Sequence, residues 1–191
     1  MKAMDDASFL VLNAAHLNKM AGPEAIVAAT GLDASAVGRV LDRAEQDGLG
    51  QRMANQFLLF PEGSKAVLDH YNATYGELRK SSELEEWYGR FETLNTQFIR
   101  NVTDWQTNGG DDASQGKLIK SAERLMKMID GLTRQIPRYT EYVRRFAASI
   151  AKTDQGQKDY VCSPMVDSVH NVWFEFHEDI LSVLGRPRDT A

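Results

Sequence analysis

The sequence predicts a mainly α-helical fold in two parts, a small N-terminal helical unit with a two-stranded β hairpin and a C-terminal helical bundle. Apolar residues recur at helical spacing along most of the chain, and alternating β-branched segments are scarce. With 42% apolar and 26% charged residues among 191, the chain can bury a sizeable core. We expect residues 1–80 to form the first domain and residues 81–191 the second.

Three helices are predicted before the hairpin, and Pro, Gly and Asp residues indicate their ends. The first spans residues 5–19. Pro23 begins the second, because the N–H that Pro lacks would be unpaired at that position, and Gly31 ends it as a left-handed cap. Asp33 is a good N-cap for the third helix, which Gly48 closes. The second and third helices are therefore joined by a short turn that contains Gly.

After the third helix the pattern changes to two short strands. Residues 49–53 and 56–60 are joined by a tight turn at Ala54 and Asn55, and Asn tolerates turn conformations well. A further helix follows over residues 61–80. This order of helices, turn and hairpin is typical of a winged helix-turn-helix.

The second half is predicted to be all-helical. Long apolar stripes and Pro or Gly at the segment ends indicate four helices, and a polar loop separates the first two. Such helices with short connections favour a bundle. The expected helices span residues 84–106, 117–136, 137–156 and 164–185.

Two stretches of the first half carry a family resemblance. Residues 31–49 and 51–67 resemble the MarR-type winged helix of bacterial transcription regulators. In that family the recognition helix ends on an acidic-x-x-Gly-Leu pattern, which Glu45–Leu49 matches. The helix after the wing starts with Leu-Thr-x-x-Gly, which Leu59–Gly63 matches, except that Phe60 stands in place of Thr. The resemblance implies a DNA-binding transcriptional regulator whose recognition helix is residues 34–46.

The resemblance also implies which side chains contact DNA. Arg39 and Arg43 are four residues apart and share one helix face, and Arg can bind guanine edges or phosphates. The other reading is that these arginines are solvated and pair with nearby Asp42 or Glu45. The expected DNA-contacting residues, including the base and tip of the wing, are Ser35, Ala36, Arg39, Arg43, Arg52 and Asn55.

The charge balance supports an alternative function. The net charge is −5, and residues 1–80 contain eight Lys and Arg against ten Asp and Glu. Because phosphate neutralisation supplies much of the affinity for DNA, each chain would bind weakly, and a homodimer would double the contacts. The alternative is a non-DNA module that binds a protein or a small molecule through a repurposed acidic winged helix.

The second half offers candidates for ligand binding but no catalytic residue. We expect a pocket for a small-molecule effector between the bundle helices. Asp167 and His170, three residues apart, indicate a carboxylate–His pair in which Asp167 favours the protonated His170. A metal enzyme built on His170 and His177 is the weakest hypothesis, because a bundle metal site needs further ligands, so neither metal nor cofactor is expected. The residues expected to line the pocket are Asn95, Asp104, Trp105, Tyr139, Arg145, His170 and Trp173.

Composition also bears on the compartment. Cys162 is the single cysteine, which excludes a disulfide within the chain and fits a reducing environment. No apolar run approaches the roughly 18 residues of a membrane-spanning helix, and the first residues become acidic where a signal peptide is apolar. We therefore expect a cytoplasmic protein without membrane contact.

Overall fold

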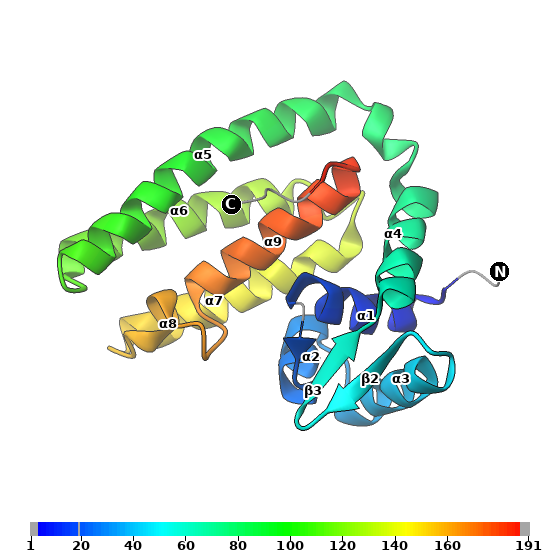
Figure 1. The fold of residues 1–191 in the computed structure, drawn as a ribbon. Coiled ribbons are helices and arrows are strands. Elements are labelled where there is room, and N and C mark those ends of the chain that lie inside the picture. The colour runs from blue at the N-terminus through cyan, green and yellow to red at the C-terminus, as the bar shows by residue number, and fades with distance from the viewer. Residues whose placement is uncertain (1–3, 19, 188–191) are drawn as a thin grey trace. The chain divides into compact units, whose positions relative to one another are not determined.

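The computed structural model describes residues 4–18 and 20–187, and it confirms the mainly α-helical fold class (Figure 1). The first part of the chain forms α1 (Asp6–Asn18), β1 (Met20–Ala21), α2 (Pro23–Thr30), α3 (Ala34–Gln46), β2 (Gly50–Met53), β3 (Gln56–Leu59), α4 (Pro61–Tyr75) and a 3-10 turn, η1 (Leu78–Lys80). The remainder forms α5 (Ser82–Thr107), α6 (Asp112–Asp130), a 3-10 turn, η2 (Pro137–Tyr139), α7 (Thr140–Asp154), α8 (Asp159–Cys162) and α9 (Val169–Leu184).

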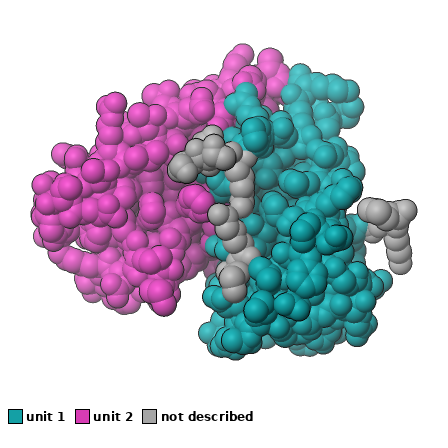
Figure 2. Space-filling view, viewed as in Figure 1, with its two compact units in different colours: residues 1–80, 177–191 teal, residues 81–176 magenta. Residues whose placement is uncertain are grey.

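The chain forms two compact units, coloured separately in Figure 2. Unit 1 comprises the described residues of 1–80 and 177–191, and unit 2 comprises residues 81–176. One division follows Lys80, at the domain boundary that is expected from the sequence. The second falls within α9, so this helix contributes its first half to unit 2 and its second half to unit 1.

In unit 1, local capping fixes the ends of α2 and α3. Pro23 occupies the first turn of α2, and Gly31 ends the helix with a φ of 69°. This left-handed conformation suits Gly, and the Gly31 N–H donates to the Val27 carbonyl. The Asp33 side chain then accepts a hydrogen bond from the Ala36 N–H at 2.8 Å and starts α3. The tight connection that the sequence predicts between these helices is present.

The sheet of unit 1 is antiparallel, with strand order β1-β3-β2. β2 and β3 form the predicted hairpin, and Ala54 adopts a φ of 53° in its turn. β1 is a third strand beyond the two predicted, and it pairs Ala21 with Phe57. A strand of two residues is too short to give an alternating pattern, so the sequence provides no signal for it.

The core of unit 1 is apolar and includes a buried polar chain. The Tyr71 hydroxyl donates to the Asn13 side-chain carbonyl at 2.9 Å, and the Asn13 amide donates to Asp179 at 3.2 Å. These bonds connect α1, α4 and the second half of α9. Around them lie fully buried apolar side chains, among them Leu12, Ile26, Val37, Leu41, Phe57 and Val67.

Unit 2 is built from α5 to α8 and the first half of α9 around an aromatic core. Phe98 and Trp173 stack in parallel with ring centroids 3.7 Å apart, and the Trp87 indole N–H donates to the Met128 carbonyl at 2.9 Å. The buried side chains that fill the rest of this core include Phe91, Leu118, Leu125, Ile129, Phe146 and Phe176.

Several helix ends in unit 2 differ from the sequence prediction. α6 begins at Asp112, inside the stretch predicted as a loop, because the Asp111 side chain accepts from the Ser114 N–H and caps it. The last helix begins at Val169 and not at Pro164, so Met165 lies outside it and is 87% exposed. None of the described helices has both the length and the hydropathy needed to cross a membrane.

Candidate nucleic-acid interface

The exposed face of α3 is the candidate nucleic-acid interface. Val37, Leu41 and Ala44 are buried and fix the rotation of this helix against the rest of unit 1. The opposite face therefore points to solvent, and Ser35 and Arg39 are exposed on it. The Arg39 guanidinium donates a hydrogen bond to the Ser35 hydroxyl one turn earlier. Arg39 has no carboxylate partner among the described residues, so its charge is available to a ligand.

The other two predicted DNA-contacting arginines are engaged in ion pairs. Arg43 lies 3.6 Å from Asp47. Arg52, on β2, pairs with Asp42 at 2.7 Å and also with Glu45. Its backbone N–H donates to Glu45 as well, at 2.6 Å. Arg52 therefore fastens the first strand of the hairpin to α3, a role for which the sequence carries no signal.

The pairing makes this surface close to neutral. Its three arginines, Arg39, Arg43 and Arg52, are matched in number by Asp42, Glu45 and Asp47, although only Arg43 and Arg52 form ion pairs with them. Exposed ion pairs of this kind contribute about 0–1 kcal/mol each, so a phosphate can compete for the arginines. Asp42 and Glu45, three residues apart on α3, can be recognised in the sequence. Their pairing with Arg52 of β2 cannot, because it depends on how the hairpin folds back.

The remaining residues of the predicted interface occupy two places. Ala36 is half-buried in the first turn of α3, beside Gly38, whose α-carbon faces open space. Asn55 is exposed in the hairpin turn, next to Met53, which is 47% exposed. The hairpin tip is therefore accessible but carries no charge.

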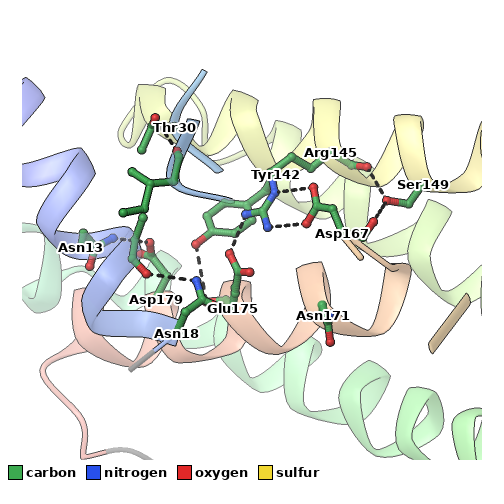
Figure 3. A network of polar contacts seen from close by, with 12 residues as sticks. Asn13, Asn18, Thr30, Tyr142, Arg145, Ser149, Asp167, Asn171, Glu175 and Asp179 are labelled. Carbon is green, nitrogen blue, oxygen red and sulfur yellow. Dashed lines mark hydrogen bonds and ion pairs between the residues drawn. The ribbon is translucent and has the colours of Figure 1, made fainter. Parts of the chain in front are cut away.

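The candidate ligand residues of unit 2 do not converge on one point. Arg145 is 4% exposed and binds two carboxylates (Figure 3). It donates to Asp167 from Nε at 3.0 Å and from Nη2 at 2.6 Å, and from Nη1 to Glu175 at 2.7 Å. Burial by itself lowers the pKa of the Arg145 guanidinium, but the charge of Glu175 and the hydrogen bonds raise it overall. Arg145 is thus a structural cation with its partners supplied by the chain.

Asn95 and Trp173 are brought together. The Trp173 indole N–H donates to the Asn95 side-chain carbonyl at 2.8 Å. His170 lies near the same group, stacked on Phe98 with centroids 6.3 Å apart. Of the other three predicted residues, Tyr139 is fully buried in the core, Asp104 is exposed, and Trp105 lies beside Gly110.

The predicted protonation of His170 is wrong. Asp167 lies before the first residue of α9, so the two residues do not share a helix turn, and the Asp167 carboxylate binds Arg145. Burial is what acts on the imidazole, and it lowers the pKa of His170 below the ordinary value.

A pH dependence of stability follows from this shift. His170 binds a proton less readily in the folded chain than in the unfolded chain. The stability that the neutral imidazole contributes is therefore complete above about pH 6.5 and is lost as the pH falls below that value. We expect His170→Phe, which cannot titrate, to lose less stability than the wild type between pH 7 and 5. Urea unfolding followed by tryptophan fluorescence measures this, because Trp87, Trp105 and Trp173 all belong to unit 2. Equal losses of stability in His170→Phe and the wild type would contradict the lowered pKa of His170.

The described part of the chain supports neither a metal site nor a reactive cysteine. Within residues 4–18 and 20–187, no group of three or more His, Cys, Asp or Glu side chains could hold a metal ion. Burial raises the pKa of the Cys162 thiol to about 11, so this thiol is protonated at neutral pH and is a poor nucleophile.

Comparison of the chain with family models, with curated proteins and with solved structures gives no match.

Proposed function

We propose that this protein is a cytoplasmic DNA-binding transcriptional regulator of the MarR-like winged helix-turn-helix type. One observation carries the proposal. α2, a three-residue turn and α3 are followed directly by a hairpin that ion pairs fasten to α3, and the exposed face of α3 offers Arg39. A helix of this kind fits the major groove, while the hairpin lies against the sugar–phosphate backbone.

Unit 2 and α9 would supply the homodimer interface and the effector response that the small DNA-binding unit lacks. Regulators of this size bind two-fold operators as dimers, with the recognition helices about one helical repeat apart. We propose that helices outside α3 form the homodimer interface, and that an effector binding to the protein modulates DNA binding. The stoichiometry of the DNA complex, two chains per site, is the readout of this part of the proposal.

The experiment is selection of binding sites from random duplexes, followed by affinity measurements with the selected site. We expect Arg39→Ala to lower the affinity by about 1–3 kcal/mol and to relax the preference at one base position. Arg52→Ala should weaken binding to all sequences about equally and flatten the salt dependence. Arg100→Ala, which removes an exposed arginine from α5, is the matched control and should leave the affinity unchanged.

A second candidate function is a non-DNA module that binds a protein or a small molecule. The observation that favours it is the pairing of Arg43 and Arg52 with acidic side chains, in a chain with a net charge of −5. If no duplex is enriched in the selection, even at low salt, the regulator proposal fails and this second candidate replaces it.

A further inference from the structure

Unit 1 contains a pocket of about 570 Å³ behind α3. The start of α1, the C-terminal half of α3 and the start of α4 form its walls. Leu12, Ala44 and Ala66 contribute apolar surface, and the two alanines leave space that larger side chains would fill. The volume lies within the range of about 300–1,000 Å³ that is typical of small-molecule sites.

The rim of this pocket is acidic. Arg43 pairs with Asp47, and Lys65 pairs with Asp69 at 2.6 Å, so both cations of the rim are neutralised. Two further carboxylates, Asp5 and Glu62, have no ion-pair partner among the described residues. The rim therefore has four carboxylates against two cations.

Asp5 is ionised at neutral pH. The Ser8 N–H donates to one of its carboxylate oxygens at 2.9 Å and the Ser8 hydroxyl to the other at 3.0 Å. The backbone hydrogen bond, with a smaller contribution from the charge of Arg43, lowers the pKa of Asp5 in spite of its partial burial. The hydrogen bonds also hold this carboxylate in place at the edge of the pocket.

We infer that this pocket binds a small organic cation, an amine carried on an apolar body. The apolar walls bury the body, and the amine lies near Asp5 and Glu62, where an opposite charge is favoured. An anionic ligand would meet Asp5 and Glu62, two carboxylates that form no ion pair with a cation of residues 4–18 or 20–187. Arg43 lies in α3 and Asp47 caps the C-terminal end of that helix, and both belong to the rim, so occupancy would alter the proposed DNA-binding face. That consequence depends on the proposed function, whereas binding of the amine does not.

The test uses three probes with the same apolar body, a phenyl ring and four methylenes: 4-phenylbutylammonium, 4-phenylbutanol and 5-phenylpentanoate. Each is titrated into the ¹⁵N-labelled full-length chain, and amide shifts are followed by NMR. We expect the amine to bind about tenfold more tightly than the alcohol, with shifts in the walls of the pocket, and the carboxylate to bind most weakly. Equal or tighter binding of the carboxylate, no saturable binding of the amine, or shifts confined to other elements would overturn the inference.

Variants locate the site. Ala66→Phe fills the pocket from α4 and should abolish amine binding, whereas Ala73→Phe, at an exposed position of the same helix, should not. Glu62→Gln removes a surface charge without adding volume, so it should weaken the amine several-fold and leave the alcohol unchanged. Retention of amine affinity in both Ala66→Phe and Glu62→Gln contradicts the assignment. DNA is absent throughout, so the result is independent of the regulator proposal.

Discussion

Arg145→Met is expected to lower the free energy of unfolding of unit 2 by about 3–5 kcal/mol. The guanidinium is 4% exposed and is held by Asp167 and Glu175. Met fills a similar volume, but it leaves Glu175, which is 7% exposed, as a buried carboxylate without its cation. Tryptophan fluorescence during urea unfolding reports on this unit. The stability is lost because the Glu175 carboxylate stays buried without a cation, and not because an attraction is lost.

The neighbouring residue provides the control. Arg144 is 52% exposed and pairs with Glu141 at 2.7 Å, so Arg144→Met should cost no more than about 1 kcal/mol. Replacing the whole group, with Arg145→Met, Glu175→Leu and Asp167→Asn together, should restore most of the stability, because no buried charge is then left unpaired. Comparable losses in the Arg144 and Arg145 single variants would show that the ion group is not the cause.

Much of unit 1 could be predicted from sequence because its signals are local. Pro23, Gly31 and Asp33 each determine a helix end through the conformation or the hydrogen bond of that residue alone, and the structure shows all three in these roles. The hairpin turn at Ala54 and Asn55 is equally local. Such features need no knowledge of what packs on the helix or strand.

The candidate sites could be predicted only in part, because their partners are distant in sequence. Arg52 is predicted only as a DNA contact, because nothing in the sequence shows that the hairpin brings it to Asp42 and Glu45. Arg145 is predicted to line a ligand pocket, because the two carboxylates that bind it, Asp167 and Glu175, lie 22 and 30 residues further along the chain and cannot be recognised as its partners in the sequence. A charged residue on the buried face of a helix signals a binding partner but does not tell whether that partner is a ligand or the chain itself.

The last helix shows a different limit. Ser163 and Pro164 form a plausible helix start, yet the chain passes through a turn there, and Val169 begins α9. The Asn171 amide donates to the carbonyls of Ser163 and Val166 and fixes this irregular segment. Moving the start by five residues separates Asp167 from the helix, which is why the predicted carboxylate–His pair does not form.

The glycine of the Leu59–Gly63 segment has a steric role. A β-carbon at Gly63 would lie 2.2 Å from the Leu49 carbonyl oxygen and 2.7 Å from the Leu59 side chain. The same carbonyl accepts the Phe60 N–H at 2.9 Å. The start of α4 therefore approaches the entry to the hairpin so closely that only Gly fits.

Gly63→Ala is accordingly expected to destabilise unit 1 by about 3 kcal/mol, although Ala is the better helix former. The obstacle is a backbone oxygen, which cannot rotate away as the end of a side chain can, so α4 and the hairpin must separate. Hydrogen exchange of the β2, β3 and α4 amides measures this, because unit 1 contains no tryptophan. Gly38→Ala is the matched control: it lies in α3 of the same unit, with nothing within 4 Å of the added carbon. It should gain up to about 1 kcal/mol from helix propensity. A gain at both positions would show that the close approach of α4 to Leu49 is absent in solution.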